Sequence, residues 1–327
     1  MILAGDIGGT KTALAVLDET SATRRIVREA TLPSHEIESF EDAVATFIGG
    51  APVLRVRAAC FGVAGPVVDG RSVTTNLPWE LEESNLAAVL GCPVRLINDL
   101  EAAATGVLDL PDEDFLILQA GQRRSGRHMA MIAAGTGLGE AFMIWAGARY
   151  HVVASEGGHV DFAPRDELEV DLLRFLRAEF GHVSYERVLS GPGLQHIYRF
   201  LQSRAGHAAP DWLRHRLGSE DPSAVISEVA LAGGDPVCVE ALDHFVSVYG
   251  SEAGNLALKA VAMGGVVVGG GIAPRIRARL TDGRFVKAFL SKGRFEELLS
   301  TIPVKVSLDP RAPLWGAARV AAEMARS

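Results

Sequence analysis

Residues 2–17 read ILAGDIGGTKTALAVL, which is an apolar run, a glycine-rich turn preceded by Asp6, and a second apolar run. Apolar stretches on either side of a Gly-Gly pair predict two antiparallel strands joined by a tight turn. Glycines after a buried strand leave backbone N–H groups open to an anion, because no Cβ stands in the way. The stretch therefore predicts either an ordinary hairpin, with Asp6 capping the turn, or a hairpin that holds phosphate, with Asp6 serving a bound cation.

Two further glycine clusters also follow apolar runs. Residues 129–144 repeat the first design, with GTGLG at 135–139 between two apolar stretches. Two similar hairpins separated by more than a hundred residues suggest a duplicated half. The glycines at 269–271 follow an apolar run and precede IAPR, a pattern that predicts a strand, a loop and a helix.

Two familiar nucleotide motifs do not fit these clusters. A P-loop has a glycine directly before its lysine, whereas Thr10 precedes Lys11 here. A dinucleotide fingerprint continues from its last glycine into a helix, whereas the residues after Gly139 predict a strand. Any phosphate binding by these clusters must therefore use another arrangement.

Composition narrows the class of protein. The 327 residues are 48% hydrophobic and 22% charged, as in a globular protein, and this length predicts two lobes with a ligand cleft between them. A formal net charge of -8 argues against a nucleic-acid or anionic-membrane partner. Three widely spaced cysteines and the absence of a long apolar run predict a protein of the reducing cytosol, without a signal peptide or a membrane span.

Strands and helices alternate along the chain, which predicts an α/β fold. Buried strands are expected at 58–63, 94–97 and 115–118, and helices at 169–179 and 236–262. We expect a small α/β domain at 1–110, completed by an Ala-rich C-terminal helix at 313–327, and a large α/β domain at 111–312.

The three glycine clusters resemble those of a known superfamily. DIGGT at 6–10, GTGLG at 135–139 and GGG at 269–271 resemble, in that order, the first phosphate, second phosphate and adenosine motifs of the sugar kinase, actin and heat-shock chaperone superfamily. The resemblance implies a two-lobed ribonuclease H-like fold with the active site in the interdomain cleft. It implies that Asp6 serves Mg²⁺, through water. It also implies an ATP site made of Gly5, Asp6, Ile7, Gly8, Gly9, Thr10, Gly135, Thr136, Gly137, Gly270 and Gly271.

Other segments resemble the bacterial glucokinase family, and the similarity runs nearly end to end. These segments are TNLPW at 75–79, LINDLEA at 96–102, SEGGHVDFAP at 155–164 and ERVLSGPG at 186–193. The resemblance implies transfer of the γ-phosphoryl of ATP to the 6-hydroxyl of glucose by a cytoplasmic homodimer. A repressor of the neighbouring ROK group is not expected, because its zinc site needs clustered cysteines and this chain starts directly on the hairpin.

The same resemblance assigns the sugar site. It makes Asp99 the catalytic base, and it implies sugar-binding roles for Asn76, Asn98, Asp99, Glu156, His159 and Glu186. The residues alone leave other interpretations open. Asn98 with Glu101 fits a helix capping box, and Glu186 could be a solvated helix residue before a turn at 190–193. Gly157-Gly158 argues against a helix between Glu156 and His159, so a loop that presents both side chains to a polyol is expected.

Two alternative functions also remain open at this point. The first is a kinase of another hexose with the same fold, acting on fructose, mannose or an amino sugar. The second is a nucleotide-dependent switch, or a sugar sensor without transfer chemistry. Glu156 and His159 favour glucose, and Asp99 beside a complete hydroxyl-binding set favours an active enzyme.

Overall fold

The chain folds into two compact units, Met1–Asp112 with Asp309–Ser327, and Glu113–Leu308. Each unit combines a mixed β-sheet with helices, so the predicted α/β class is confirmed. Asn76, one of the expected sugar-binding residues, lies outside the described residues. The computed structural model describes residues 1–18, 25–50, 54–74, 77–206 and 208–326.

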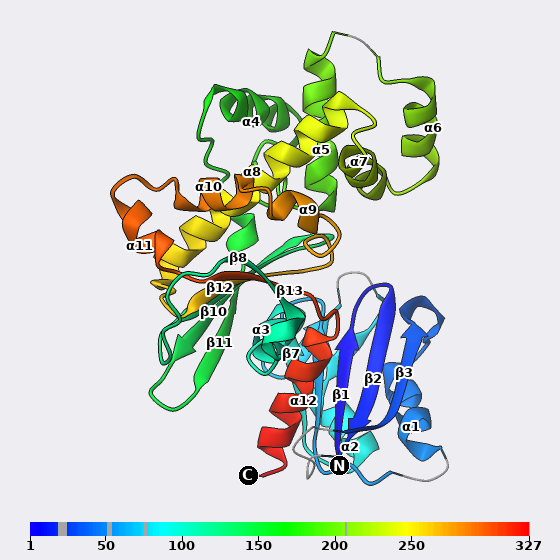
Figure 1. The fold of residues 1–327 in the computed structure, drawn as a ribbon. Helices are drawn as coiled ribbons and strands as arrows, with labels where there is room; N and C mark the ends of the chain where they lie inside the picture. The colour runs from blue at the N-terminus through cyan, green and yellow to red at the C-terminus, as the bar shows by residue number, and fades with distance from the viewer. Residues whose placement is uncertain (19–24, 51–53, 75–76, 207, 327) are drawn as a thin grey trace. The chain divides into compact units, whose positions relative to one another are not determined.

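The first unit is built on a five-stranded sheet of order β3-β2-β1-β4-β7 (Figure 1). Three strands run parallel (β1, β4 and β7), and β2 and β3 are antiparallel neighbours. The predicted opening hairpin is confirmed, because Ile7 pairs with Thr12 across the turn. The strands of this unit are β1 (Ile2–Ile7), β2 (Lys11–Leu17), β3 (Ile26–Pro33), β4 (Ala59–Val63), β7 (Val94–Asn98) and the separate pair β5 (Arg71–Val73) and β6 (Glu80–Glu82).

Alternate residues along β1 face two apolar clusters, one on each side of this sheet. Leu3 and Ile7 pack in a cluster with residues of α1 and α2, and Ile2 and Ala4 pack with residues of α3 and α12. The C-terminal helix α12 thus lies on the first unit beside β1 (Figure 1). The helices of this unit are α1 (Phe40–Gly49), α2 (Glu83–Leu90), α3 (Asp99–Gly106), α12 (Ala312–Met324) and the 3₁₀ turn η1 (Ser34–Glu36).

The second unit repeats the first sheet and adds one strand. Its order is β11-β10-β9-β12-β13-β8, and the first five positions match those of the first unit in order and direction. This shared topology supports the suggestion of a duplicated half. The strands are β8 (Phe115–Gln119), β9 (Met129–Ala134), β10 (Leu138–Trp145), β11 (Tyr150–Ser155), β12 (Gly265–Gly269) and β13 (Val304–Ser307).

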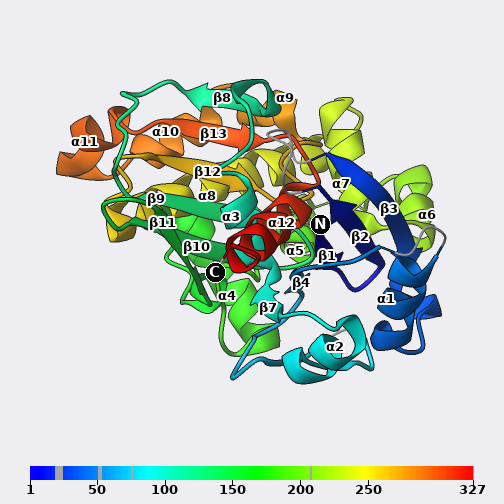
Figure 2. The same ribbon diagram turned by 90° about the horizontal axis from the view of Figure 1, so that it is seen from below.

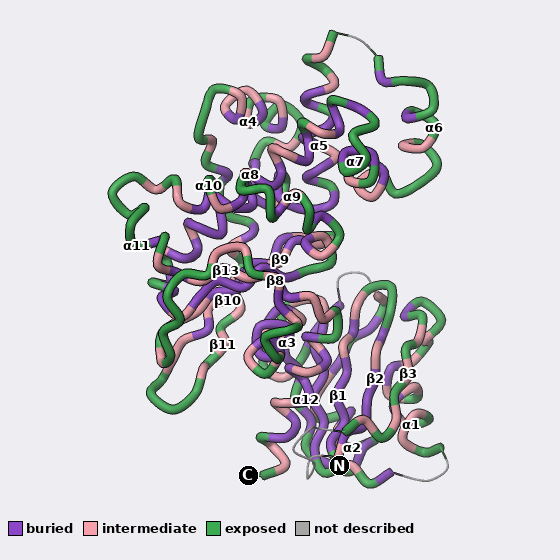
Figure 3. The backbone as a smooth tube through the Cα atoms, viewed as in Figure 1, coloured by how far each residue is buried: buried purple, intermediate pink, exposed green. Residues whose placement is uncertain are grey.

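The burial expected for residues 115–118 is only partly right. These residues form β8, but β8 is an edge strand that, within the part of the chain that the structure describes, pairs only with β13, and Ile117 is 56% exposed. The apolar run resembles a central strand, yet nothing in the described residues covers both of its faces. Figure 3 shows the contrast between the buried inner strands and exposed parts of the second sheet, such as the β10–β11 turn at 146–149.

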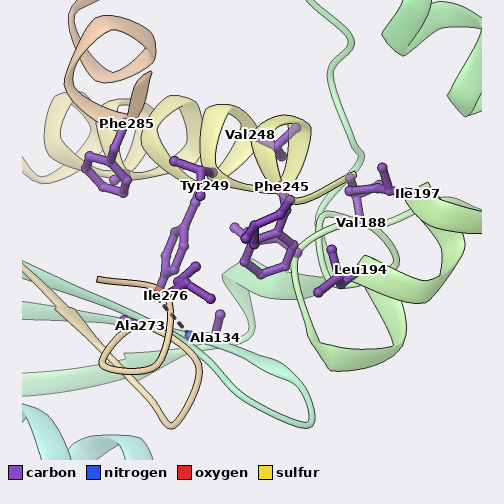
Figure 4. Close-up of a cluster of buried hydrophobic side chains, with 14 of the residues drawn as sticks. Ala134, Val188, Leu194, Ile197, Phe245, Val248, Tyr249, Ala273, Ile276 and Phe285 are labelled. Atoms are coloured by element: carbon purple, nitrogen blue, oxygen red, sulfur yellow. Dashed lines mark hydrogen bonds between the residues drawn. The ribbon is translucent and has the colours of Figure 1, made fainter. Parts of the chain in front are cut away.

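Helix α8 forms the centre of the second unit and contacts β9 and β12 (Figure 2). Its Tyr249 ring packs edge-to-face on Phe245, 6.0 Å between centroids, and on Phe285 at 5.7 Å (Figure 4). The helices expected at 169–179 and 236–262 are confirmed as α4 and α8. The helices are α4 (Glu167–Phe180), α5 (Gly191–Arg204), α6 (Asp211–Ser219), α7 (Pro222–Leu231), α8 (Pro236–Ala260), α9 (Arg277–Leu280), α10 (Arg284–Leu290) and α11 (Glu296–Ser300), with 3₁₀ turns η2 (Asp112–Asp114), η3 (Gly157–His159) and η4 (Gly293–Phe295).

None of the helices within the described residues combines the length and the apolar character that a membrane span needs.

Candidate active site

The carboxyl ends of β1, β4 and β7 meet at one edge of the first sheet, and Asp6 and Asp99 lie there. Gly62 of β4 pairs with Asp6 of β1, and the Cα of Gly62 faces α3. A Cβ at Gly62 would lie 2.9 Å from Ala102 Cβ and 3.8 Å from Asp99 Cα. Glycine at this position therefore lets α3 pack closely on the sheet, which brings Asp99 toward Asp6.

The two carboxyl groups influence each other. Burial, and in second place the negative charge of Asp99, raise the pKa of Asp6 to about 6. Like charges at short range favour either a proton on one group or a cation beside both. Asp6 is therefore a carboxylate whose charge a nearby cation would stabilise.

Asn98 holds the start of α3. Its Oδ1 accepts hydrogen bonds from the N–H groups of Leu100 at 2.9 Å and Glu101 at 3.4 Å. Its Nδ2 donates to the carbonyl of Gly65 at 3.0 Å. The capping role expected for Asn98 is confirmed. One N–H of its amide is engaged by Gly65, and the second is the group that a sugar hydroxyl could accept from.

Ser34 fixes the first glycine-rich turn, and sequence reasoning missed it. Its Oγ donates to the carbonyl of Gly8 at 2.7 Å and lies 2.9 Å from Thr12 Oγ1. Its N–H donates to the carbonyl of Thr10 at 3.0 Å. The turn residues Gly9 and Thr10 are exposed. A single serine 22 residues from Thr12 carries no sequence signal for this contact.

Gly5 and Ile7 are placed differently from the turn glycines. Both are buried within β1. A Cβ at Gly5 would lie 2.5 Å from Phe61 Cδ1, so this glycine makes room for the core of the first unit. The structure therefore gives Gly5 a packing role, and the exposed part of the motif is Gly9 and Thr10.

The second glycine-rich turn lies between β9 and β10. The N–H of Gly135 donates to the carbonyl of Gly137 at 2.8 Å, and the carbonyl of Gly135 accepts from the N–H of Gly191 at 2.8 Å. Thr136 between them is exposed. The turn expected at 190–193 is in fact the start of α5, because Ser190 caps that helix through a hydrogen bond from the Gly193 N–H at 3.0 Å.

The third glycine cluster packs directly on this turn. A Cβ at Gly270 would lie 2.3 Å from the carbonyl oxygen of Ala134, the last residue of β9. Tyr249 joins the two strand ends: its hydroxyl accepts from the Ala134 N–H at 3.1 Å, as Figure 4 shows, and donates to the Gly269 carbonyl at 3.1 Å. The second and third clusters are therefore held together inside the second unit.

A cavity of about 370 Å³ opens beside the second and third clusters. This volume is in the range of small-molecule pockets. Sequence reasoning found the glycines and the segment at 186–193 that begins α5, but it did not place α5 and α7 at the walls of a cavity. The lining residues are Gly135, Thr136, Gly191, Pro192, Leu194, Gln195, Asp221, Ser223, Ala224, Ser227, Gly271, Ile272, Arg275 and Ile276.

Three of the expected sugar-binding side chains converge in the second unit. His159 Nε2 lies 3.8 Å from Glu156 Oε2, and His159 Nδ1 lies 3.9 Å from Glu186 Oε1. The side chains of Glu156 and His159 are 78% and 59% exposed, so they can meet a ligand. Residues Gly157–His159 form one 3₁₀ turn, so the expected loop contains a short helical turn but no α-helix.

Comparison with known proteins identifies the family. The glucokinase family profile matches residues 3–324. The chain belongs to the glucokinase family. It is 40% identical over 340 residues to a glucokinase of Nostoc sp., with 99% of each chain covered. A glucokinase crystal structure from an Antarctic psychrotroph matches with a TM-score of 0.87 and 34% identity, over 100% of this chain and 99% of that one.

A second solved glucokinase supports the two-lobed fold predicted from the glycine clusters. A ROK family glucokinase from Streptomyces griseus, in complex with glucose and AMPPNP, matches with a TM-score of 0.65 and 25% identity. The match covers 98% of this chain and 99% of that one. The fold class expected from the sequence is thus confirmed.

The carboxylates of this glucokinase family member fit a magnesium ion whose other ligands are water and nucleotide phosphates. Among the residues that the structure describes, no group of three or more His, Cys, Asp and Glu side chains could hold a metal. Mg²⁺ keeps several waters and takes one or two carboxylates together with nucleotide phosphates. Asp6, a half-buried carboxylate beside an exposed glycine-rich turn, would fit as the protein ligand of such an ion.

Proposed function

We propose that the protein is an ATP-dependent glucokinase that transfers the γ-phosphoryl group of Mg²⁺-ATP to the 6-hydroxyl of glucose. The observation that carries the proposal is the position of Glu186. One of its oxygens accepts from the Leu138 N–H at the second glycine-rich turn, and the other lies beside His159. One carboxylate thus contacts both the turn that would bind phosphate and the cluster that would bind the sugar. Direct transfer requires that the two substrates be bound next to each other.

The sugar side uses Glu156, His159 and Glu186. Each carboxylate accepts hydrogen bonds from sugar hydroxyls, and the imidazole between them can donate or accept. Fixed donors and acceptors select one arrangement of hydroxyls, because a mismatched sugar leaves a polar group without a partner. This set supports a hexose as the acceptor, and Asn76 belongs to the same proposal.

Asp99 is the proposed base, and Asn98 orders the neighbouring hydroxyls. Asp99 is the first residue of α3, so the positive end of the helix stabilises its carboxylate form. This stabilisation makes it a weak base. We therefore propose that Asp99 has two roles. It orients the 6-hydroxyl, and it accepts the hydroxyl proton late in the transfer, when the hydroxyl oxygen has begun to bond to phosphorus.

The nucleotide side uses the two glycine-rich turns and the cavity. Backbone N–H groups at Gly9 and Thr10, and at Thr136 and Gly137, would bind the phosphates, in turns closed by the N–H groups of Gly8 and Gly135. The cavity next to Gly271 would take the adenosine, with Gly270 holding the loop against β9. Asp6 would hold Mg²⁺ through water, and the ion, when bound, would neutralise charge on the phosphates.

We also propose that the two compact units are the functional domains, and that the protein is a cytoplasmic homodimer. The resemblance to bacterial glucokinases supports this assignment. Analytical ultracentrifugation of the purified protein measures the assembly: a mass twice that of the 34.7 kDa chain is expected, and a single-chain mass would contradict it.

A coupled assay of ADP formation tests the activity. Glucose, fructose, mannose and N-acetylglucosamine are each offered with Mg²⁺-ATP, and kcat/KM is compared. We expect glucose to exceed each other sugar by about tenfold or more, the discrimination that a hydrogen-bonding site provides. A higher kcat/KM for another hexose would make the protein that sugar's kinase, and no ADP formation with any of them would point to a sensor.

A further inference from the structure

A buried polar network lies beneath the proposed sugar-binding residues, and the mechanism above does not use it. Glu140 of β10 is 1% exposed and Glu252 of α8 is 0% exposed. Acidic side chains are rarely buried unless they are paired, because taking a carboxylate out of water is costly. Two of them side by side therefore need an explanation.

Glu252 is the centre of this network. Its Oε1 accepts from Lys259 Nζ at 3.0 Å, and its Oε2 accepts from Asn255 Nδ2 at 2.7 Å. Its charge also acts on Tyr185 and on Glu140, and Glu140 Oε1 is buried with no hydrogen-bond partner among the described residues. Two buried carboxyl groups next to each other favour a proton on one of them, because both cannot be charged at low cost. Since Glu252 carries the lysine contact, Glu140 is the group that holds the proton.

Glu140 supports the segment that presents Glu156 and His159. A Cβ at Gly157 would lie 2.2 Å from Glu140 Oε2, so the carboxyl packs directly against this glycine. The backbone carbonyl of Glu140 accepts from Ser155 Oγ at 3.0 Å, and that hydroxyl accepts from the Gly157 N–H at 3.2 Å. Glu140 thus contacts the segment through its side chain and its backbone.

The same network supports Glu186 from the other side. Tyr185 precedes Glu186, its hydroxyl accepts from Asn255 Nδ2 at 3.1 Å, and its N–H donates to the carbonyl of Val160 at 3.0 Å. The segments that carry the three proposed sugar-binding side chains of this unit therefore rest on Glu140 and on Tyr185, which is linked to Glu252 through Asn255.

We propose that Glu140 is a positioning residue for the hexose: buried against Gly157 and bonded to Ser155, it fixes the segment that presents Glu156 and His159. The inference rests on the proposed function, because it assumes that these two side chains bind the sugar. Its consequence is that hexose affinity depends on a buried carboxyl that never touches the sugar.

The charges around Glu140 are consistent with a neutral carboxyl. Burial, and then the charge of Glu252, raise the pKa of Glu140 to about 7, and the opposing effect of Lys259 is smaller. The other ionisable groups around the network come from neighbouring segments. Tyr185 has a raised pKa and Lys292 a lowered one, both chiefly through burial, and Arg165 pairs with Glu169. Glu140 therefore keeps its proton up to near-neutral pH.

Two substitutions at this position separate positioning from mere packing. Glu140→Gln supplies an amide N–H where the carboxyl proton was, whereas Glu140→Ala removes the carboxyl and leaves a hole beside Gly157. At pH 7 we expect Glu140→Ala to raise the glucose KM by about tenfold or more, with the ATP KM changed by less than about twofold. We expect Glu140→Gln to retain the glucose KM within about threefold of wild type.

The control is Leu299→Ala, a buried leucine of α11, which should lower the melting temperature without raising the glucose KM. A folded Glu140→Ala variant with a wild-type glucose KM would overturn the inference, as would a Glu140→Gln variant that is impaired equally. If Glu140→Ala does not fold, Glu140→Leu decides, because it fills the space without a polar atom: a raised glucose KM supports the inference, and an unchanged one overturns it.

The results that would contradict the proposed function differ from those that would contradict only this inference. A wild-type protein that does not phosphorylate glucose would overturn the function and this inference together. Wild-type activity combined with an unchanged glucose KM in Glu156→Gln would remove Glu156 from the sugar site and overturn the inference, while leaving the glucokinase activity in place.

Discussion

Glu186 Oε2 accepts a hydrogen bond from the backbone N–H of Leu138 at 3.0 Å. Leu138 follows the second glycine-rich turn directly, and a Cβ at Gly137 of that turn would lie 2.6 Å from the same carboxylate oxygen. The glycine therefore has a role besides the phosphate binding proposed for it: it makes room for the side chain that we propose reaches the sugar.

Gly137→Ala is expected to displace the Glu186 carboxylate and to raise the glucose KM by about tenfold, because one fixed acceptor for a sugar hydroxyl is lost. The melting temperature should change little, since the clash is with the far end of a flexible side chain. Gly135→Ala is the matched control, because a Cβ there meets nothing within 4 Å among the described residues. Equal glucose KM values for both variants would contradict this role of Gly137.

Glu156→Gln is expected to weaken glucose binding while leaving nucleotide binding intact. The amide presents a donor where a hydroxyl hydrogen should point, so we expect about a tenfold loss of glucose affinity. Calorimetry with glucose and, separately, with AMPPNP measures both affinities. A fall in AMPPNP affinity with unchanged glucose affinity would place Glu156 on the nucleotide side.

Asp99→Asn is expected to lower kcat by about 10²–10⁴-fold while the fold and much of the sugar affinity remain. Asparagine is nearly isosteric, so it keeps the geometry but cannot take the proton. Turnover at saturating glucose and Mg²⁺-ATP is measured together with a thermal melt. Asn98→Ala is the comparison: losing the cap of α3 should cost about 1 kcal/mol of stability. An Asp99→Asn protein with near wild-type kcat would remove Asp99 from the chemistry.

Tyr249→Phe removes the hydroxyl that accepts from the Ala134 N–H and donates to the Gly269 carbonyl. Leaving these buried groups unpaired should lower the free energy of unfolding by about 1–3 kcal/mol, as measured by urea denaturation. The ATP KM should rise more than the glucose KM, since both strand ends carry loops that we propose bind the nucleotide. Tyr198→Phe is the control, because its hydroxyl donates to Gln202 on the same helix. Equal losses in the two variants would refute the special role of Tyr249.

Stability should depend on pH through Glu140. Its pKa is about 7 in the folded protein against an ordinary value of 4.5, so the carboxyl favours folding when protonated. This contribution is complete below the ordinary value and is lost as the pH rises through about 7. Glutamine does not titrate, so the melting temperature of Glu140→Gln minus that of wild type should increase between pH 5 and pH 8, two values chosen to bracket this window. A difference that stays constant would show that Glu140 does not titrate there.

Much of the fold could be predicted because its hairpins and helices depend on residues that are close together in the sequence. The two glycine-rich hairpins and α8 follow from apolar periodicity and from glycine placement. The exposure of β8 could not be predicted, since an edge strand and a central strand have the same composition when no pairing partner is known.

The site was only partly predictable for a similar reason. Family resemblance pointed to Glu156, His159 and Glu186, but the walls of the cavity come from α5 and α7, whose contacts are distant in sequence. Ser34 and Glu140 carry no motif of their own. Their importance appears only when the fold brings Ser34 to the first turn and buries Glu140 against α8.

The central claim is the transfer of the γ-phosphoryl group of ATP to the 6-hydroxyl of glucose. Phosphorus NMR of the purified protein with glucose and Mg²⁺-ATP follows donor and product in one sample. We predict that glucose 6-phosphate and ADP appear in equal amounts, and that ATP remains intact when glucose is left out. ADP formed without a sugar phosphate, or phosphate on a hydroxyl other than the sixth, would contradict the account.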